Sequence, residues 1–360
     1  MKINNKELKE MVNVAGLKKS DNFVDIATNK DGIMFRMGNL IYTAKGKHEF
    51  EDSGYTMTAE NFLNLTKALS NRYGDVKIEN NSITFKDDGI DITNKIEASD
   101  KIELPGLETE LLSIDTEELI EALKECKTFQ AGKDINRKTL RGVCIKYKHI
   151  DNSVDIVALD GFRAIVKPIK LKRQANLNED CEFVLTEQTV EMIKKIKSYE
   201  EIIIKQTPAP YERKYITFGD VMILQSFVDE NYFDYESVFR IDTQYKVEYS
   251  EKEVAELLKY YDKCKKLFRN RCVVKSTIEN GKQVLLSMEG NTKVEITLPA
   301  KAQERFMVAY NGVYMQEVLS VFEDSDKITV SMQKDIYPII FEDGIKKALL
   351  LPVRLKENER

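Results

Sequence analysis

The chain contains few of the residue types that build catalytic and metal sites. Only two histidines, His48 and His149, occur in 360 residues, which leaves almost no basis for a histidine triad or a multi-histidine metal site. Each histidine follows a lysine, so we expect both rings at solvated surface positions. Glycine-rich phosphate loops, HExxH and GxSxG are all absent. We therefore expect neither an enzyme nor a bound cofactor or metal.

Paired cysteines and long apolar runs are also missing. The five cysteines are Cys126, Cys144, Cys181, Cys264 and Cys272, and none forms a CxxC pair. An odd number without such pairs favours reduced thiols in hydrophobic cores over disulfides or zinc ligands. No run of about 18 apolar residues exists, and the N-terminus is polar by its fourth residue, so we expect no membrane span, no signal peptide and a cytoplasmic protein.

The total charge excludes one class of nucleic-acid binder. Lysine and arginine number 55 against 60 aspartates and glutamates, and a net charge of −5 does not suit a uniformly basic protein. The length indicates two or three domains, and a hydrophobic content of 42% provides a core for each.

One helix start occurs three times along the chain. Asn4, Asp115 and Ser250 each stand three residues before a glutamate, which is the spacing of a capping box. An amphipathic stripe of apolar residues follows each cap, and a short strand-like stretch precedes it. This repetition in one register predicts an internal triplication.

A second helix and a strand hairpin complete every repeat. The strands expected at 76–78, 202–204 and 328–330 are each followed by a partner strand of similar sequence, beginning at Ile83, Ile216 and Ile339. We therefore predict three copies of a β-α-β-β-β-α-β-β unit, with boundaries near residues 106 and 243. In the first copy the stretch before Val24 is short, as though a strand and its turn were missing.

The stretch after the first helix of every repeat is basic. Residues 250–271 hold seven cations against four anions in a chain that is acidic overall. Cations near a helix C-terminus gain about 0.3 to 1 kcal/mol each from the helix dipole, which explains part of this pattern. The alternative is that the repeated helices present one positive surface to phosphates. The sequence alone leaves both explanations open.

Acidic runs offer a remote alternative function. Glu230 and the run from Glu323 to Asp326 could in principle hold Mg²⁺ and support a nuclease. A chain that is one-sixth acidic produces such runs routinely, so we give this reading little weight.

Two segments resemble the bacterial DNA polymerase III β subunit, the sliding-clamp family. The motif Leu140-Arg-Gly142, followed by VALDGFRA from Val157, resembles the clamp's middle domain, where the corresponding stretch reads threonine-aspartate-glycine-histidine-arginine-leucine. The motif YNGVY ending at Tyr314 resembles the clamp's closing helix. LPVRL, ending at Leu355, resembles its terminal methionine-proline-methionine-arginine-leucine.

The resemblance implies an α+β fold of three repeated clamp domains, at 1–106, 107–243 and 244–360. Two chains would join head to tail as a homodimer, with helices lining the inside of a ring and antiparallel sheets outside. Such a ring encircles duplex DNA without sequence specificity and acts as a processivity factor in DNA replication. It would tether the replicative polymerase and the clamp loader through short linear peptides. Phosphate contacts alone are salt-sensitive and cannot hold a protein on DNA for long, whereas a closed ring can.

The family's site residues carry over to this sequence as two sets. The peptide-binding groove, expected as an apolar pocket rimmed by two arginines, comprises Leu140, Leu159, Gly161, Phe162, Arg163, Phe233, Val238, Tyr314, Leu351, Pro352, Val353, Arg354 and Leu355. The DNA-facing candidates are Lys18, Lys19, Lys133, Arg137, Lys138, Lys266, Arg269 and Arg271. Residues 351–355 have an alternative interpretation as a buried terminal strand.

Several residues depart from the family pattern. Phe162 replaces the family histidine, Leu159 its threonine and Ala164 its leucine. Phe233 stands where clamps carry proline, and residues 356–360 extend beyond the usual terminal leucine. We therefore expect an altered peptide preference. The alternative function is a protein-interaction scaffold that keeps the fold and the groove but does not encircle DNA.

Overall fold

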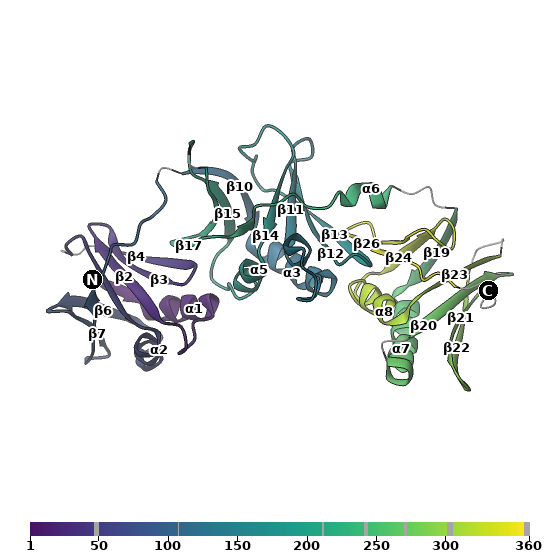
Figure 1. Ribbon diagram of the computed structural model, residues 1–360, viewed down its shortest axis with the longest axis horizontal. Coiled ribbons are helices and arrows are strands. Elements are labelled where there is room, and N and C mark those ends of the chain that lie inside the picture. Colours follow the sequence, from purple (N-terminus) through teal and green to yellow (C-terminus); the bar gives the residue numbers. More distant parts are fainter. Residues whose placement is uncertain are drawn as a thin grey trace.

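The computed structural model describes residues 1–46, 50–106, 108–210, 212–240, 244–269, 272–300 and 305–355. Three units repeat one element order, β-α-β-β-β-β-α-β-β-β, along the chain. Figure 1 shows the units side by side along the longest axis of the molecule.

The first unit consists of the ten repeated elements alone. Its elements are β1 (Lys2–Asn4), α1 (Asn5–Ala15), β2 (Phe23–Asn29), β3 (Gly32–Met37), β4 (Leu40–Lys45), β5 (Ser53–Thr58), α2 (Ala59–Ala68), β6 (Tyr73–Glu79), β7 (Ser82–Asp87) and β8 (Ile90–Lys95). The short strand β9 (Glu97–Ala98) follows in the linker to the second unit.

The second unit carries extra short helices. Its repeated elements are β10 (Thr109–Asp115), α3 (Thr116–Cys126), β11 (Val143–Lys148), β12 (Ser153–Leu159), β13 (Arg163–Lys170), β14 (Cys181–Leu185), α5 (Glu187–Ile193), β15 (Glu201–Gln206), β16 (Lys214–Phe218) and β17 (Val221–Ile223). A 3-10 turn, η1 (Lys127–Phe129), and α4 (Lys138–Arg141) lie between α3 and β11. The linker to the third unit contains β18 (Phe227–Val228) and α6 (Tyr235–Phe239).

The third unit has the longest helix. Its elements are β19 (Tyr245–Ser250), α7 (Glu251–Phe268), β20 (Val273–Glu279), β21 (Lys282–Glu289), β22 (Thr292–Pro299), β23 (Phe306–Asn311), α8 (Gly312–Ser320), β24 (Lys327–Met332), β25 (Ile339–Glu342) and β26 (Lys347–Leu350).

The predicted unit was two strands too short, and the first copy lacks no strand. All three copies share the same ten elements. The extra residues after the first helix of the second copy form η1 and α4, and those of the third copy extend α7. Among the last strands, β17 escaped prediction because it has only three residues, and β8 because it is mostly exposed and only Ile90 and Ile92 of its six residues are apolar.

The three predicted helix starts are confirmed. The side chain of Asn4 accepts a hydrogen bond from the Glu7 amide, and Asp115 accepts from two amides at the start of α3. Ser250 accepts from the Glu253 amide, and the Glu253 side chain accepts from the Ser250 amide in return. Each cap satisfies helix amides that would otherwise lack partners, so the repeated motif has a local structural cause.

Backbone pairing joins neighbouring units into continuous sheets. One nine-stranded sheet runs β10-β15-β16-β17-β4-β3-β2-β5-β9, and a second runs β18-β14-β11-β12-β13-β26-β25-β24-β19. We call the antiparallel β17–β4 pairing the first joint and the β13–β26 pairing the second joint. Four-stranded sheets, β1-β6-β7-β8 and β22-β21-β20-β23, remain at the two ends of the molecule.

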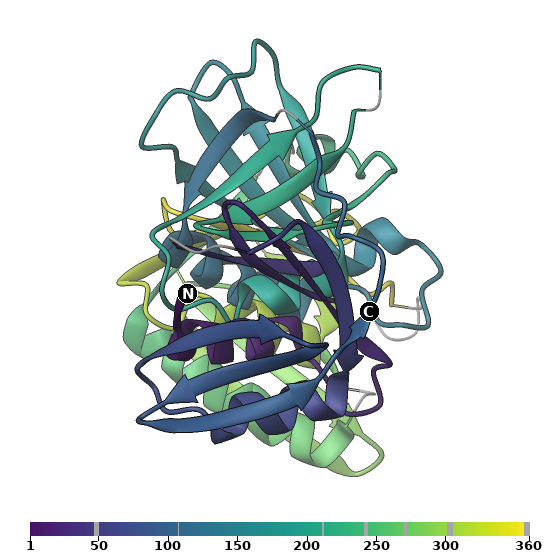
Figure 2. The ribbon, with the colours of Figure 1, turned by 90° about the vertical axis from the view of Figure 1, so that its left-hand side faces the viewer.

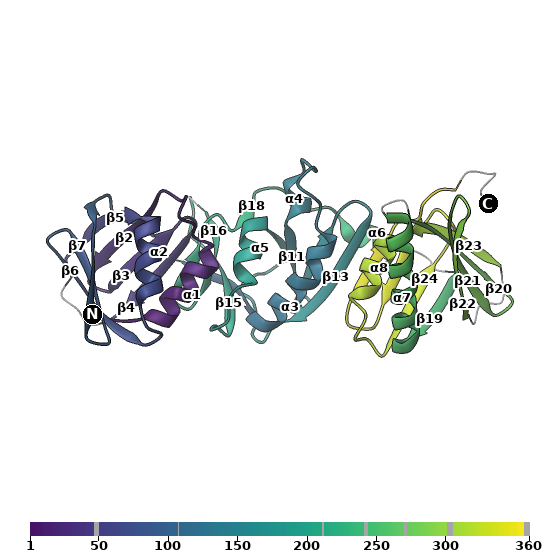
Figure 3. The same cartoon turned by 90° about the horizontal axis from the view of Figure 1, so that it is seen from below.

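Helices and strands occupy opposite sides of an arch. Figure 1 shows α1, α3, α5, α7 and α8 along the concave side and the two linkers on the convex side. Figure 3, seen from below, shows the same helices in a row in front of the sheets. Figure 2 looks from the first-unit end, where a sheet faces the viewer and covers the helices behind it.

The core lies between helices and sheets and continues through all three units. Cys126, Cys144, Cys264 and Cys272 are buried, Cys181 is half-buried, and all five thiols are free. His149 is exposed, as expected, whereas His48 lies outside the described residues. No helix within the described ranges is long and apolar enough to cross a membrane.

Candidate functional site

A separate apolar cluster lies on the convex side of the second joint. Its buried members are Cys144, Val157, Leu159, Ala164, Val166, Val184, Tyr232, Tyr235 and Leu349. On these strands the neighbouring residues, such as Ile145, Ile156 and Ile165, belong to the helix-side core instead. Because side chains alternate along a strand, the cluster occupies the face opposite the helices. We call it the outer cluster.

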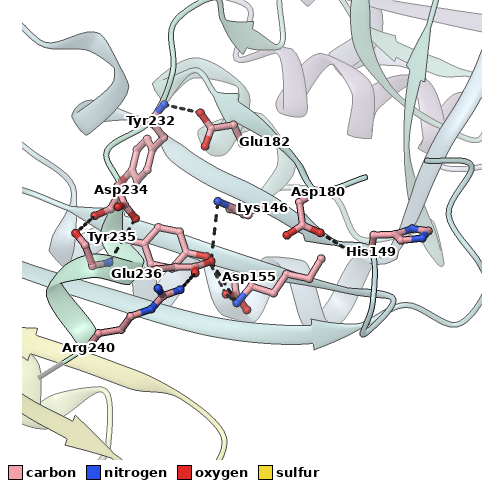
Figure 4. Close-up of polar contacts among 12 residues, drawn as sticks. Lys146, His149, Asp155, Asp180, Glu182, Tyr232, Asp234, Tyr235, Glu236 and Arg240 are labelled. Carbon is pink, nitrogen blue, oxygen red and sulfur yellow. Dashed lines mark hydrogen bonds and ion pairs between the residues drawn. The ribbon is translucent and has the colours of Figure 1, made fainter. Parts of the chain in front are cut away.

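The linker between the second and third units covers the outer cluster through two tyrosines and a set of polar contacts (Figure 4). The Tyr235 hydroxyl donates to Asp155 Oδ2 at 2.8 Å, and Lys148 Nζ lies 2.8 Å from the same oxygen. The Tyr232 amide donates to Glu182 Oε1 at 2.8 Å. Burial, with the Asp155 charge adding to it, raises the pKa of Tyr235, so the hydroxyl stays a donor.

An aromatic surface lies beside the outer cluster. Phe162, in the turn between β12 and β13, is 55% exposed. Its ring centroid lies 5.8 Å from that of Tyr314 in α8. The Leu351 amide donates to the Phe162 carbonyl at 2.9 Å, and Leu351 is itself 38% exposed. Segments from the second and third units therefore combine to expose apolar groups at one place.

Arg163 supports this aromatic surface from beneath. Its Nε and Nη2 donate to Asp160 Oδ2 at 3.1 and 2.8 Å, and its Nη1 pairs with Glu317. The guanidinium lies 4.2 Å from the Tyr314 ring centroid, a cation–π contact. Arg163 is only 7% exposed. The prediction that it forms the rim of the groove together with a second arginine is therefore wrong. Arg354 is the exposed member of that pair.

The tight turn before Arg163 depends on a glycine and an aspartate. Gly161 has φ +91°, and no atom lies within 4 Å of a Cβ placed there, so only the backbone conformation favours glycine. Asp160 Oδ1 accepts from the amides of Phe162 and Arg163, both at 2.8 Å. The turn thus presents Phe162 outward and Arg163 inward.

The terminal segment 351–355 is not a buried strand. β26 ends at Leu350, and Leu351 and Arg354 are exposed. Pro352, Val353 and Leu355 are half-buried, and the Val353 amide donates to the Ala309 carbonyl at 2.7 Å. The alternative interpretation of this segment is therefore wrong. Residues 356–360 lie outside the described residues.

The remaining groove candidates lie on the two segments that border the outer cluster. Leu140 in α4 and Val238 in α6 are half-buried and pack against it, and Leu159 is one of its members. Phe233, just before α6, is 39% exposed. The structure thus gathers Leu140, Leu159 and Val238 on the cluster, next to the turn that carries Phe162.

Sequence reasoning missed several residues that hold this region together. Asp155, Tyr235 and Glu182 gave no signal because their partners are 50 or more residues away. Glu317 follows Tyr314 by three residues on α8, so helical spacing could have placed both side chains on one face.

The cation candidates form two groups. Lys18 and Lys19 follow α1, while Lys266 and Arg269 lie at the end of α7. All four are exposed. Lys19 Nζ lies 2.8 Å from Glu60, and Lys266 Nζ lies 2.6 Å from Asp262. Helix-end cations with local acidic partners fit the dipole explanation as well as a phosphate-facing role.

The second group lies close to the outer cluster. Lys133, Arg137 and Lys138 are exposed, and Arg137 and Lys138 begin the short helix α4 that also carries Leu140. Arg271 lies outside the described residues. Within the described ranges no group of three or more histidines, cysteines or carboxylates is arranged to hold a metal ion.

The fold matches solved structures along almost the whole chain. The β subunit of DNA polymerase III from Pseudomonas aeruginosa superimposes with a TM-score of 0.78 at 14% identity and covers 99% of both chains. The β subunit from Thermotoga maritima (TM-score 0.77, 19% identity) and the DNA polymerase sliding clamp from Bacillus subtilis (0.76, 17%) also match over 99% of both chains. No protein-family model and no curated relative matches the sequence. The chain therefore has the DNA sliding-clamp fold, and the predicted α+β class is confirmed.

Proposed function

We propose that the protein is a DNA sliding clamp, a ring-shaped homodimer that encircles duplex DNA and tethers replication proteins. The three repeated units serve as domains 1–106, 107–243 and 244–360. The observation that carries the proposal is the way the units join. At both joints the last strand of one unit pairs with the strand of the preceding unit that is equivalent to β4. At the two ends of the molecule one strand of each of these kinds has no partner on its outer side.

The free edges are complementary by position. In the three units β4, β13 and β22 are equivalent, and β8, β17 and β26 are equivalent. The first joint pairs β17 with β4, and the second pairs β26 with β13. The strands left over are β8 and β22, and each forms a sheet edge at one end of the arch. A second copy would pair its β22 with β8, and two such pairings close a ring in which neither β8 nor β22 remains an exposed edge.

The concave helices support an interior that faces DNA. α1 and α7 lie on the concave side in Figure 3, and Lys18, Lys19, Lys266 and Arg269 sit at their C-terminal ends. Loose phosphate contacts of this kind permit sliding because they carry no sequence information. Retention would come from ring closure rather than from affinity.

The second joint supports partner binding. Phe162, Tyr314 and Leu351 expose apolar surface beside the outer cluster, and Leu140 and Val238 border it. Such a surface suits a short peptide with hydrophobic anchors, through which a polymerase or clamp loader would dock. We propose no catalytic role and no cofactor for the protein.

A topological experiment tests the ring. The protein is mixed with closed circular plasmid at a concentration where dimers exchange, cross-linked with an amine-reactive reagent, and passed through gel filtration in 1 M NaCl. A closed ring co-elutes with the circle and is released when a restriction enzyme linearises the plasmid. A protein that remains monomeric by light scattering at micromolar concentration, or elutes free of the circle, contradicts the proposal.

A scaffold that does not encircle DNA is the second candidate. The pairing of Lys19 with Glu60 and of Lys266 with Asp262 favours it, because local acids already neutralise these cations. Reversing Lys18 and Arg269, which lie at the C-terminal ends of the concave helices α1 and α7, to glutamate separates the two functions. A clamp would lose loading or sliding, whereas a scaffold would bind its partners unchanged.

A further inference from the structure

The equivalent strands β4, β13 and β22 all begin after the same kind of turn. Each follows a two-residue hairpin turn that opens with a glycine of positive φ. These glycines are Gly38 at +62°, Gly161 at +91° and Gly290 at +58°. Counted from the turn, the third strand residue is Tyr42 in β4, Ile165 in β13 and Val294 in β22. These three residues therefore occupy one equivalent position.

The last strands of the three units can be aligned in the same way. In every unit a phenylalanine of the preceding strand lies opposite one residue of the last strand. The pairs are Phe85 with Ile92, Phe218 with Val221, and Phe341 with Ala348. Ile92 in β8, Val221 in β17 and Ala348 in β26 therefore occupy a second equivalent position.

Both joints pair these two positions with each other. Tyr42 lies opposite Val221 at the first joint, and Ile165 lies opposite Ala348 at the second. All four side chains are buried in the core on the helix side. One register therefore serves both joints, although the side chains that meet there differ.

The same register would bring apolar residues of the free edges, β8 and β22, together. It places Ile92 of one copy opposite Val294 of the other and, two residues along each strand, Ile90 opposite Ile296. Ile92, Val294 and Ile296 are half-buried and pack against the helix-side core, and Ile90 is 66% exposed. Pairing would remove these side chains from water, which favours this register. A shift of two residues in either direction would pair one of them with a polar side chain.

Backbone hydrogen bonds at the joints define the geometry of the equivalent pair. The Leu224 amide donates to the Asn39 carbonyl at the first joint, and the Leu351 amide donates to the Phe162 carbonyl at the second. Each bonded pair stands three residues along from the equivalent pair. Because bonded and non-bonded pairs alternate along an antiparallel ladder, the equivalent pair is a non-hydrogen-bonded one. Its Cα atoms lie about 4.5 Å apart, within the range that a disulfide spans.

The convex side of the same edge pairing is polar. The register places Asp91 opposite Glu295 and Thr93 opposite Lys293, and Lys293 Nζ lies 2.7 Å from Glu295 in its own chain. Lys86 lies opposite Asp91 in the neighbouring strand β7. Since each carboxylate has a cation beside it within its own chain, this side adds little to closure. The apolar side next to the helices therefore supplies most of the closing free energy.

We propose that two copies close through an inner seam, in which Ile92 and Ile90 of one copy lie opposite Val294 and Ile296 of the other. This inference rests on the proposed ring and goes beyond it, because it fixes the register and names the side chains that hold the ring shut. The seam lies on the helix side of the closing joint, away from the groove at the second joint.

Engineered cysteines in the full chain test the register. Oxidation with diamide should convert most of the variant I92C/V294C to a dimer, with a disulfide between positions 92 and 294 identified by mass spectrometry. The shifted variants I92C/I296C and I90C/V294C place the two cysteines on a diagonal and should each give less than about a tenth as much. The single variants I92C and V294C should give none. All variants carry Cys181→Ser, because Cys181 is the half-buried native thiol.

A charge placed in the seam gives a second measurement. Ile90→Asp puts a carboxylate opposite Ile296 and should weaken the dimer about tenfold or more in sedimentation equilibrium, because a carboxylate is costly to bury against apolar groups. Ile345→Asp is the matched control. Ile345 is also 66% exposed but lies between β25 and β26, so this variant should dimerise like the wild type.

Light scattering on the same samples separates two kinds of failure. A wild type that stays monomeric refutes the ring and the inner seam together. A dimer that cross-links equally well in a shifted variant, or that does not cross-link in I92C/V294C, leaves the ring standing and overturns the seam. An equal loss of dimer in Ile90→Asp and Ile345→Asp also overturns it.

Discussion

The two joints use equivalent strands but different polar contacts. At the first joint Glu7 in α1 accepts hydrogen bonds from the hydroxyls of Tyr42, at 3.2 Å, and Tyr199. Glu10 accepts from Ser198 Oγ at 2.6 Å. Both carboxylates belong to the first unit and accept from neutral hydroxyls, of which those of Tyr199 and Ser198 come from the second unit and that of Tyr42 from the first. The ion pair between Lys45 and Asp220 also crosses this joint, but its side chains are exposed.

The second joint relies on buried cations instead. Lys167 Nζ on β13 lies 2.7 Å from Glu121 and 3.2 Å from Glu125. Lys346, beside β26, lies 2.9 Å from Glu125 on α3 and so bridges the two units. Arg163 joins Asp160 to Glu317 of the third unit.

The comparison shows that one backbone pairing tolerates different side-chain chemistry. Neutral hydroxyl donors lose little on burial, whereas a buried cation depends on all of its partners. The convex sides differ as well, because Ile102 of the first linker covers a small cluster. At the second joint two tyrosines cover a larger cluster and leave Phe162 and Leu351 exposed. The second joint, which depends on buried cations and their partners, is therefore also the joint that presents the larger apolar surface.

Removing Arg163 should have the largest effect. Arg163→Met keeps the apolar stem but leaves Asp160 and Glu317 without their cation, and we expect a loss of about 3 kcal/mol in the free energy of unfolding. Urea denaturation followed by circular dichroism measures it. Arg240→Met is the matched control, because that side chain is 77% exposed, and it should change stability by less than about 0.5 kcal/mol. Equal losses in both variants would contradict a special role for the buried cation.

Removing the two hydroxyls should weaken the first joint less. The double variant Y42F/Y199F should lose about 2 kcal/mol, since each hydroxyl donates to a carboxylate. Burial, followed by Glu7, raises the pKa of both tyrosines above its unfolded value of about 10.

Because the folded state keeps these hydroxyls protonated, their contribution is complete below pH 10 and is lost as the pH rises toward the folded pKa. Denaturation at pH 9 and pH 11 should therefore show a smaller decline for the double variant than for the wild type. An identical decline would show that the hydroxyls do not carry the alkaline sensitivity. Tyr73→Phe serves as the control, since Tyr73 is 69% exposed.

Truncating Phe162 should affect binding rather than stability. Its ring is 55% exposed, so Phe162→Ala should change the free energy of unfolding by less than about 0.5 kcal/mol. A labelled peptide with leucine and phenylalanine anchors, such as GSLALF, should bind about tenfold more weakly, or about 1.4 kcal/mol. Phe23→Ala removes a ring of equal exposure, 56%, from the first unit and should leave binding intact. If both variants bind equally, the partner surface does not lie at the second joint.

The smallest expected effect is the loss of folding stability at acid pH that comes from protonation of Glu121. The hydrogen bond from Lys167, with the attraction of its charge, lowers the pKa of Glu121. This contribution is present above the unfolded pKa of about 4.3 and is lost as the pH falls through the folded value. Because the carboxylate is 68% exposed, we expect no more than about 0.5 kcal/mol.

Unfolding at pH 5 and pH 3 should show a smaller acid decline for Glu121→Gln than for the wild type. The control Glu117→Gln alters an exposed residue of the same helix and should follow the wild type. Hydrogen exchange at pH 3 can locate the change, because amides of β26 should open before those of β17. The reverse order would mean that the first joint is the acid-sensitive one.

The sequence by itself determined the triplication, the caps and, in every unit, the strand before the first helix and the hairpin after the second helix. Asn4, Asp115 and Ser250 act on amides two or three residues away, and the apolar stripes depend on local periodicity. Such features involve neighbouring residues and can be recognised without knowing the fold. The turn at Asp160, Gly161 and Phe162 is local in the same way, because its hydrogen bonds close within four residues, although the sequence was not used to predict it.

Only the tertiary structure decided which strands join and what each charged group does. Arg163 pairs with Glu317, which is 154 residues away in the sequence, and Tyr235 bonds to Asp155, which is 80 residues away. No local sequence pattern contains either pair. β17 follows no clear alternation because it has three residues and gains its role from pairing with β4. The burial of an arginine and the pairing of a short edge strand depend on neighbours brought together by folding, and a linear pattern does not record them.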